Sequence, residues 1–216
     1  LKNMGYDVSA LDVADSDYSS ETVFPVTFYD GRVIPFPDAS FDFIFSSNVL
    51  EHIRDTENIN RELRRVLKPG GIMVHILPSA SWRFWTTLTA FPSAPALAVR
   101  TLFDPRIAAR QPTRMKKSIY KLWRATRRLG SPFIFARHGE WGNAFTELKT
   151  FGKNAWTNYF LKHGYDILSY DTVSLFYTGS SMCGRMLSLE TRRGLSRILG
   201  SSCHVFVVKP GESSQR

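Results

Sequence analysis

The sequence predicts an α/β protein with a doubly wound, mostly parallel sheet into which a helical cap is inserted. Three observations predict it. Between residues 41 and 77, an apolar segment, a helical pattern and a second apolar segment follow one another with short links, as in a βαβ unit. A similar rhythm resumes after residue 150 and ends in a β-branched segment at 203–208. Residues 78–137 follow neither pattern, and we interpret them as the insertion.

The bulk composition fits one domain of generous size. The chain has 216 residues, of which 43% are hydrophobic, so it can bury a sizeable core. Cys183 and Cys203 form no disulfide or metal-ligand pattern, and we expect no metal site. No signal peptide and no apolar run of roughly 18 residues is recognised. We therefore expect a cytoplasmic protein. Because the chain begins at Leu1 within an apparent helix end, we also expect a fragment.

Two candidate binding residues lie at the start of the chain. Residues 6–12 and 23–29 are strand-like, and Gly5 ends the helical turn before them. Asp12 closes the first strand, where an acid can accept hydrogen bonds from both hydroxyls of a ribose. An exposed acid or a helix cap is an equal alternative. Asp30 and Gly31 follow the second strand; they can face a flat amine-bearing ring or form an ordinary turn.

Small polar residues follow the third predicted strand, at 41–45. Ser47 lies in this segment and suits a polar ligand tail. Glu51 and His52 could transfer protons, although orienting a loop is the simpler role for His52. Asp55 or Thr56 can then cap a helix that the Lys68-Pro-Gly-Gly turn ends, before a strand at 72–77.

Three segments together resemble the small-molecule methyltransferases of the seven-stranded, S-adenosylmethionine-dependent superfamily, of the type 11 kind. They are Asp30-Gly-Arg-Val-Ile-Pro-Phe-Pro-Asp-Ala-Ser-Phe-Asp42, then Ser47-Asn-Val-Leu-Glu-His52, then Arg61-Glu-Leu-Arg-Arg-Val-Leu-Lys-Pro-Gly-Gly71. The similarity covers about residues 6–77, with a weaker match at 160–167. It implies a Rossmann-like sheet and S-adenosylmethionine as the cofactor.

The resemblance also implies roles for single residues. Asp12 corresponds to the acid that binds the cofactor ribose, Asp30 and Gly31 to positions lining the adenine, and Ser47 to a position bordering the methionine portion. The glycine-rich loop of the family has no counterpart in the chain. We therefore expect residues 1–216 to form a single methyltransferase-like domain that lacks its first strand and this loop, which would weaken cofactor binding by the fragment.

The net charge of +9 lies between residues 106 and 128, within the insertion at 78–137. Nine basic residues and no acidic ones lie between residues 106 and 128, and the remaining residues sum to zero. Met115, Ile119, Leu122 and Leu129 fall at helical spacing there, beside Trp123, so we expect a basic amphipathic helix. It is a solvated face, a contact with an anionic membrane, or an RNA-binding element. The solvated face ranks first and the membrane second; nucleic acid ranks last because no binding module accompanies the charge.

The segment Arg137-His-Gly-Glu-Trp-Gly-Asn143 follows the insertion. In the family this region roofs the acceptor pocket, and His138 and Glu140 are our catalytic candidates for deprotonating an acceptor hydroxyl. A turn packed by Trp141 is the alternative. The segment is also similar to methyltransferases of bacterial surface-glycan clusters.

The expected function is methyl transfer from S-adenosylmethionine to a small polar acceptor such as a saccharide or a lipid-linked saccharide, with peripheral contact at the inner membrane through 106–128. A non-enzymatic methyltransferase-like binding domain and an RNA methyltransferase are the alternatives. The sequence makes no prediction of the oligomeric state.

Overall fold

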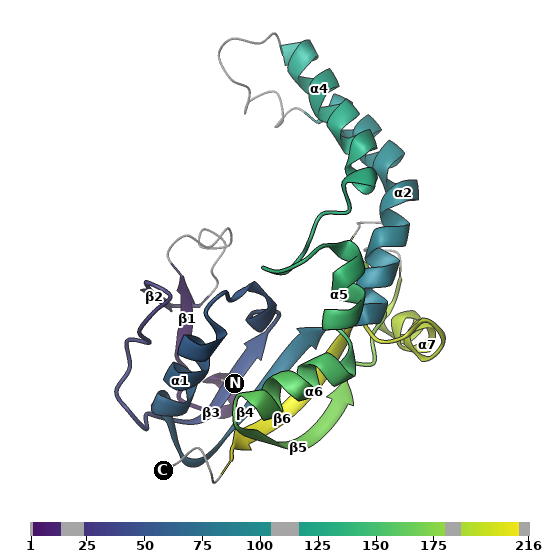
Figure 1. The fold of residues 1–216 in the computed structure, drawn as a ribbon. Helices are drawn as coiled ribbons and strands as arrows, with labels where there is room; N and C mark the ends of the chain where they lie inside the picture. The colour runs from purple at the N-terminus through teal and green to yellow at the C-terminus, as the bar shows by residue number, and fades with distance from the viewer. Residues whose placement is uncertain (1, 14–23, 105–116, 180–186, 212–216) are drawn as a thin grey trace.

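The computed structural model describes residues 2–13, 24–104, 117–179 and 187–211 (Figure 1). Its strands are β1 (Ala10–Val13), β2 (Val26–Tyr29), β3 (Phe41–Ser47), β4 (Leu67–Pro78), β5 (Tyr165–Thr172) and β6 (Cys203–Pro210). Its helices are α1 (Thr56–Val66), α2 (Ala80–Phe103), α4 (Lys117–Gly130), α5 (Ala144–Thr150), α6 (Lys153–Lys162) and α7 (Leu189–Leu199). Short 3-10 turns are η1 (Lys2–Met4), η3 (Leu50–His52) and η4 (Ser131–Ile134).

The described strands form two sheets. One contains β1 and β2, which are parallel, and the other has the order β3-β4-β6-β5. Strands β3 and β4 are parallel, and β6 is antiparallel to both β4 and β5. Strand β5 therefore runs in the direction of β4, and only β6 is reversed within this sheet. The predicted α/β class with a mostly parallel sheet is confirmed.

The core lies on one face of the four-stranded sheet, beneath α1 and α6. Met73 and Leu77 of β4 and Phe206 of β6 point into it and are fully buried. Trp156 and Phe160 reach it from α6, as their spacing predicts. Helix α1 begins at the cap Asp55, whose carboxylate accepts a hydrogen bond from the backbone N–H of Asn58.

The opposite face of the sheet is less covered. Phe43 and Phe45 of β3 lie on it and are 44% and 54% exposed. Their neighbours on β4, Ile72 and Val74, are only partly buried. A doubly wound sheet has helices on both faces, and among the described residues α1 and α6 form a layer on one face only.

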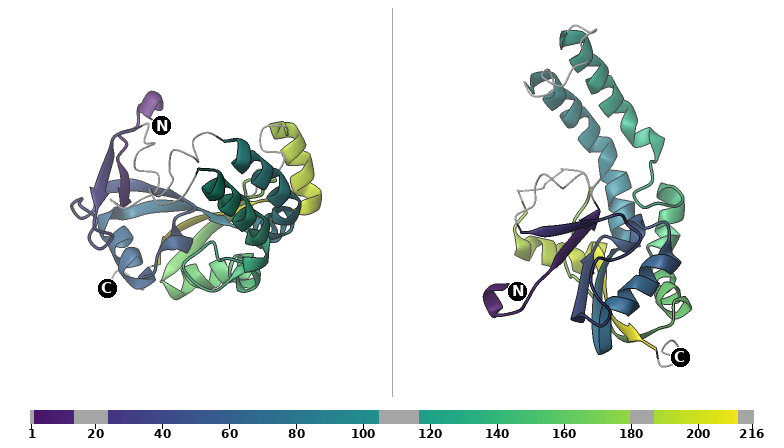
Figure 2. Two further views of the ribbon diagram at one scale, coloured as in Figure 1. Left: turned by 90° about the horizontal axis from the view of Figure 1, so that it is seen from above. Right: turned by 90° about the vertical axis from the view of Figure 1, so that its left-hand side faces the viewer.

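The predicted insertion forms a helical arm that projects from the domain (Figures 1 and 2). Helix α2 is continuous through Pro92 and Pro95. Proline removes a backbone donor and kinks helices. Thr89 and Ser93 donate hydroxyl hydrogen bonds to carbonyls one turn earlier, at 2.6 and 2.7 Å, and so supply extra donors in this stretch.

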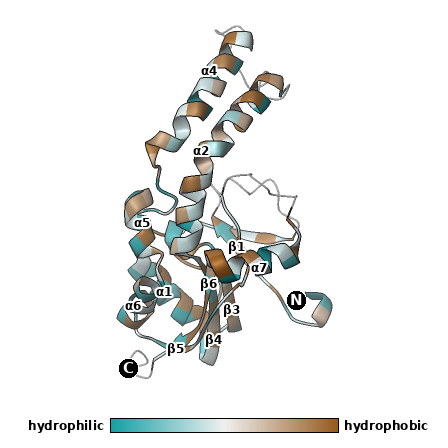
Figure 3. Ribbon diagram, turned by 90° about the vertical axis from the view of Figure 1, so that its right-hand side faces the viewer, coloured by the Kyte–Doolittle hydropathy of each residue, from teal (hydrophilic) through white to brown (hydrophobic). Residues whose placement is uncertain are grey.

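Helix α4 packs along α2, which confirms the predicted helix. Tyr120 and Ala125 are its buried residues, whereas Ile119, Leu122 and Leu129 are exposed. Met115 lies outside the described residues. Brown, hydrophobic segments mark both helices of the arm in Figure 3. No helix in the described ranges is long and apolar enough to span a membrane.

Two helices and one loop differ from the sequence-based expectation. Helices α5 and α7 were not predicted, and α5 carries a capping box in which Asn143 and Thr146 bond reciprocally. The apolar residues at 174–177 favour a strand, but the structure has none there. The backbone bonds to scattered partners instead; for example, the N–H of Phe176 donates to the carbonyl of Arg192.

Candidate functional site

The first part of the candidate site lies where β1 and β2 end. Their parallel register places Asp12 opposite Phe28 and Val13 opposite Tyr29. The turn after β2 then packs against the end of β1. A Cβ on Gly31 would lie 3.6 Å from a side-chain methyl of Val13, and Gly31 has a φ of +77°, which favours glycine. Asp12 and the Asp30–Gly31 turn are thus brought to one edge, as predicted.

The two carboxylates at this edge already make local bonds. One oxygen of Asp12 accepts from the N–H of Val13 at 2.8 Å. One oxygen of Asp30 accepts from the N–H groups of Arg32 and Val33 at 2.8 and 3.2 Å, which lowers the pKa of Asp30. Asp30 therefore stays ionised at neutral pH. Its turn-forming role, the simpler interpretation of the sequence, is present.

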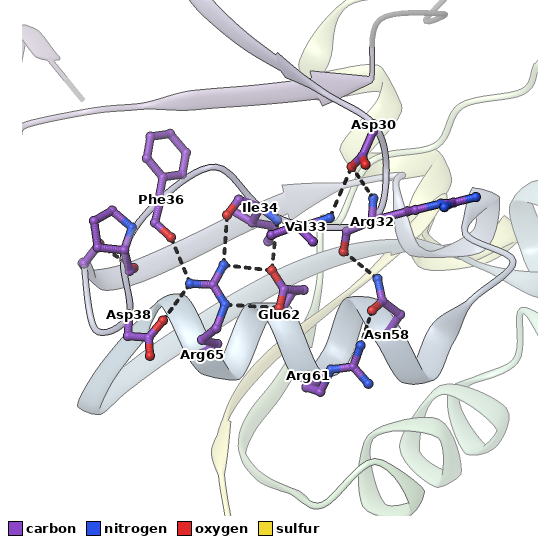
Figure 4. Close-up of polar contacts among 12 residues, drawn as sticks. Asp30, Arg32, Val33, Ile34, Phe36, Asp38, Asn58, Arg61, Glu62 and Arg65 are labelled. Atoms are coloured by element: carbon purple, nitrogen blue, oxygen red, sulfur yellow. Dashed lines mark hydrogen bonds and ion pairs between the residues drawn. The ribbon is translucent and has the colours of Figure 1, made fainter.

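A network of charged side chains fixes the loop that follows this turn (Figure 4). Arg65 of α1 donates to the backbone carbonyls of Ile34 and Phe36 at 2.8 and 2.9 Å. The same guanidinium bonds to the carboxylates of Asp38 and Glu62 at 2.7 and 2.8 Å. These bonds raise the pKa of Arg65, Glu62 being the larger cause and Asp38 the smaller.

The other side of the network holds the backbone N–H groups. Glu62 accepts from the N–H of buried Ile34 at 2.9 Å, and its hydrogen bond with Arg65 lowers the pKa of Glu62. Asn58 donates to the carbonyl of Arg32 at 2.7 Å. Every charge in this network has a partner, so the network is a support that positions the Asp30–Gly31 turn.

Ser47 is the last residue of β3 and is exposed. Asn48 donates to its hydroxyl at 3.3 Å. In Figure 1, β1, β3 and β4 all point toward the same end of the molecule. Ser47 therefore lies at the same end as Asp12, which agrees with the predicted convergence of the strand ends.

A second group of side chains lies just beyond Ser47. It consists of Glu51 and His52 in η3 and His138 in the loop after the arm, and we name it the Glu-His-His cluster. The Glu51 carboxylate is 3.9 Å from Nε2 of His52 and 4.0 Å from Nε2 of His138. Trp82 meets the edge of His138, with ring centroids 4.6 Å apart.

The backbone of the 137–143 loop docks directly on η3. The N–H of Glu140 donates to the carbonyl of Glu51 at 2.9 Å. A Cβ on Gly139 would lie 2.8 Å from that same carbonyl oxygen, so only glycine fits there without a shift. This close approach places His138 beside Glu51, although the two residues are far apart in sequence.

A buried ion pair anchors the same loop from below. One carboxylate oxygen of Glu147 accepts from the N–H groups of His138 and Gly139 at 2.7 and 2.8 Å. The other lies 2.8 Å from Nε of Arg83, and Glu147 is fully buried. Arg83 also donates to the carbonyl of Ala136. The pair fixes the position of His138.

The predicted catalytic residues His138 and Glu140 have different surroundings. His138 belongs to the cluster, and burial lowers its pKa to about 4, with smaller contributions from the charges of His52 and Arg83. The Glu140 carboxylate accepts from Nε of Arg54 at 2.6 Å, and that bond lowers its pKa. Glu140 therefore remains a paired carboxylate on the rim of the loop.

Glu51 has the most unusual surroundings in the site, although the sequence favoured His138 and Glu140 as the catalytic candidates. Its side chain is fully shielded from solvent, and neither carboxylate oxygen has a hydrogen-bond partner among the described residues. Burial raises the pKa of Glu51 to about 7. The adjacent Glu-His pair after a strand was the available signal, but its burial depends on the distant 137–143 loop. Arg83 and Glu147 carried no signal in the sequence.

A hollow of about 470 Å³ lies away from these strand ends and is lined by residues of α5, α6 and the turn between them. We define the candidate site by its side chains and strand ends.

Residues 2–75 match a family model described as a methyltransferase domain. A 62-residue segment is 37% identical to phosphoethanolamine N-methyltransferase 2 of Caenorhabditis elegans, covering 29% of this chain and 14% of that protein. A 50-residue segment is 50% identical to demethylmenaquinone methyltransferase of Streptomyces griseus, covering 23% and 22%. The matched part of the chain thus spans less than a quarter of the length of either relative.

The chain is also similar in structure to a solved protein. An S-adenosylmethionine-dependent methyltransferase from Mesorhizobium loti is similar over 92% of this chain and 77% of its own, with a TM-score of 0.41 and 14% identity.

Proposed function

We propose that the protein transfers a methyl group from S-adenosylmethionine to a small polar acceptor, starting from the match of residues 2–75 to the methyltransferase-domain family model. The observation that carries the proposal is the place of the family segment in the fold. Its candidate residues gather where β1, β2 and β3 end, the edge at which open α/β sheets bind ligands.

The described residues fit the adenosine half of the cofactor. Asp12 would accept hydrogen bonds from the ribose hydroxyls. Asp30 and Gly31 would line the adenine, because a positive φ and the missing side chain of Gly31 let a flat ring approach the backbone. Ser47 would border the methionine portion. The network of Arg65 and Glu62 would keep this edge in place before the cofactor arrives.

When bound, the cofactor supplies an electrophilic methyl group on a sulfonium. The acceptor atom forms a bond to this carbon as the carbon–sulfur bond breaks, and a hydroxyl acceptor also releases its proton. The protein's main task is to hold the acceptor in line with that bond, which can supply several kcal/mol. His138 is our candidate for contacting the acceptor, because it lies in the cluster beyond Ser47. Glu140 we assign to holding the loop through Arg54.

We propose a saccharide or lipid-linked saccharide as the acceptor. The matched segment does not select one, since the two relatives that share it are named for phosphoethanolamine and demethylmenaquinone. The support is the similarity of the 137–143 segment to surface-glycan methyltransferases, together with the properties of the arm.

We further propose that a strand outside these 216 residues completes the sheet between β1 and β3. The two described sheets are separate at this point, and neither β1 nor β3 has a second strand partner among the described residues. The partly exposed face carrying Phe43 and Phe45 would be covered by a helix that accompanies this strand. The glycine-rich loop expected for the family would link the two.

The arm is proposed as a contact with an anionic membrane. Ile119, Leu122 and Trp123 lie on the side of α4 that faces away from α2, and each is between 44% and 58% exposed. Arg127 stacks on Trp123, at 4.9 Å from the ring centroid. Exposed apolar side chains with neighbouring cations are the pattern of an interfacial helix. Basic residues near an anionic surface contribute about 1 kcal/mol each.

Co-sedimentation with vesicles tests the membrane contact. We expect wild-type protein to pellet with anionic vesicles and not with neutral ones, and less so at high salt because charges are screened beyond about 10 Å at 0.1 M. Replacing Lys116, Lys117, Arg127 and Arg128 with Gln should abolish pelleting. The matched control replaces four other basic residues: Lys149, Lys162, Arg193 and Arg197. Equal loss in both variants, or no pelleting of the wild type, would refute a contact through the arm.

Titration calorimetry with S-adenosylhomocysteine tests the cofactor site in the full-length protein. Asp12→Ala should weaken binding by about 1.5–3 kcal/mol, the range for hydrogen bonds to a charged group. Asp42→Ala is the matched control, because Asp42 lies at the opposite end of β3 and pairs with Lys68. An unchanged affinity for Asp12→Ala would remove the ribose role, and an absence of binding by the wild type would remove the cofactor.

A further inference from the structure

The Glu51 carboxylate is exceptional among the buried acids of the described residues. Three glutamates there are buried: Glu51, Glu62 and Glu147. Glu62 is hydrogen-bonded to Arg65, and Glu147 forms an ion pair with Arg83, at 2.8 Å in both cases. Glu51 has neither a cation of this kind nor a hydrogen bond. Leaving a carboxylate in such a place costs several kcal/mol unless a charge compensates it.

The nearest groups to this carboxylate are two imidazoles. The ligand atoms of Glu51, His52 and His138 all lie within 4.8 Å of one another. Glu51 Oε1 is 3.9 Å from one imidazole Nε2 and 4.0 Å from the other. Ligands bonded to one tetrahedral zinc ion at about 2.0–2.2 Å lie roughly 3.3–3.5 Å apart. Side-chain movements of less than an ångström would therefore close the three groups around an ion.

We propose that Glu51, His52 and His138 bind a divalent transition-metal ion. Two imidazole nitrogens and one carboxylate oxygen form a donor set typical of zinc and of non-haem iron(II). The site differs from the sequence-based expectation of no metal, because its third ligand comes from a loop 86 residues further along the chain.

The surroundings support the ligands in the way that metal sites require. The backbone N–H groups of His138 and Gly139 are tied to Glu147, and the carbonyl of Glu51 accepts from Glu140. Held ligands bind metal more tightly than free ones. The imidazole rings of His52 and His138 meet edge to face, at 4.8 Å between centroids, and Trp82 closes the side of His138.

An ion with three protein ligands has further positions for oxygen atoms of a substrate. In the proposed methyltransferase, neighbouring hydroxyl groups of a saccharide acceptor would occupy them. This last step rests on the proposed function, whereas binding of the ion does not, so that metal binding is measured without cofactor or acceptor.

The test uses the chelator-treated full-length protein and cobalt(II) as a spectroscopic probe, with zinc calorimetry beside it. We expect one ion per chain and a visible cobalt absorption from mixed nitrogen and oxygen ligands. His52→Ala and Glu51→Gln should each weaken binding at least tenfold, since losing even a partner of a ligand costs about 10–100-fold. His52 is partly exposed, so its replacement should leave the fold intact.

The matched control is Glu57→Gln. Glu57 also lies beside a histidine, with 3.4 Å to Nδ1 of His163, but its carboxylate is exposed and it pairs with Lys162. It should bind cobalt as the wild type does. Wild-type protein that binds no ion, or equal binding by wild type, His52→Ala and Glu51→Gln, would overturn the proposal. Metal binding without binding of S-adenosylhomocysteine would uphold the metal site and contradict the proposed function alone.

Discussion

The network around the loop at 32–38 and the Glu-His-His cluster are both polar groups of side chains, but they differ in how their charges are paired. Around the loop at residues 32–38, every charged group is paired. Arg65 donates hydrogen bonds to two carbonyls and two carboxylates, and Glu62 accepts hydrogen bonds from Arg65 and from a backbone N–H. In the Glu-His-His cluster, the central carboxylate of Glu51 is buried and has no bond among the described residues.

This difference distinguishes a network that stabilises a loop from a cluster that can bind a ligand. A satisfied network gives rigidity and leaves little for a ligand to gain. A buried charged group without a partner destabilises the ligand-free protein, and a ligand that pairs with it removes this cost. Groups with strongly perturbed pKa values are common at functional sites for this reason. By this criterion, we propose that the 32–38 network supports the cofactor edge and that the Glu-His-His cluster binds a ligand.

The largest effect is expected from the buried pair of Arg83 and Glu147. Glu147→Gln leaves the Arg83 guanidinium buried without its counter-charge, which typically costs about 3–5 kcal/mol. Urea denaturation should show this loss in the free energy of unfolding. A change of less than roughly 1 kcal/mol would mean that the pair is solvated and does not hold the His138 loop.

The next effect concerns pH and His75, whose Nδ1 bonds to the hydroxyl of Ser46 at 2.7 Å. Burial lowers the pKa of His75 to about 4 from 6.5, so the folded protein keeps it neutral while the unfolded chain protonates first. Its contribution is complete above pH 6.5 and is lost as the pH falls from 6.5 to 4. It amounts to about 3 kcal/mol.

Comparison with His75→Gln isolates this contribution from those of other histidines. Denaturation at pH 7 and pH 4.5 should show a larger loss of stability for the wild type than for the variant. Equal losses in the two proteins would contradict the assignment.

A smaller effect is expected from the support network. Arg65→Ala removes the bonds to Ile34, Phe36, Asp38 and Glu62 at once, yet Arg65 is partly exposed and water can replace some of them. We expect a smaller loss in the free energy of unfolding than for the buried pair of Arg83 and Glu147. Weaker binding of S-adenosylhomocysteine should accompany it. A variant with normal stability and normal binding would show that the loop is held by its prolines alone.

The smallest effect has the opposite sign. Glu51→Gln keeps the shape of the side chain but removes a buried charge that has no partner, so the metal-free variant should be more stable than wild type at pH 8 by about 1 kcal/mol. Thermal denaturation in chelator measures it. If Glu51→Gln instead destabilises the protein, as expected for Glu147→Gln, then Glu51 has a structural partner. The two regions would then not differ in how their charges are paired.

Local sequence patterns predicted the elements whose structure depends on near neighbours. The α1 and α6 helices, the strands around them and the cap at Asp55 were all predicted, because apolar spacing and capping residues act within a few positions. Helix α7 was missed because Gly194 and its many polar residues weaken the helical pattern. Helix α2 was not predicted, and its sequence contains Pro92 and Pro95, which are unfavourable inside helices.

The site shows the same limit. Asp12 and Ser47 lie at the ends of strands and Asp30 directly follows one, and strand ends in parallel sheets converge, so their approximate place was predictable. The burial of Glu51 was not, since it depends on Gly139 and the Arg83–Glu147 pair in distant segments. Helical spacing placed Ile119 and Leu122 on one face of α4, but it could not say that this face would be exposed.

Hydrogen–deuterium exchange of the full-length protein, with and without S-adenosylhomocysteine, tests the central claim most directly, namely that the ends of β1 and β2 form the cofactor edge. The account predicts slower exchange of amides at residues 10–13 and 30–33 in the presence of the ligand, and unchanged exchange in α4 at 117–130. Ligand binding with no protection of 10–13 and 30–33 would contradict it.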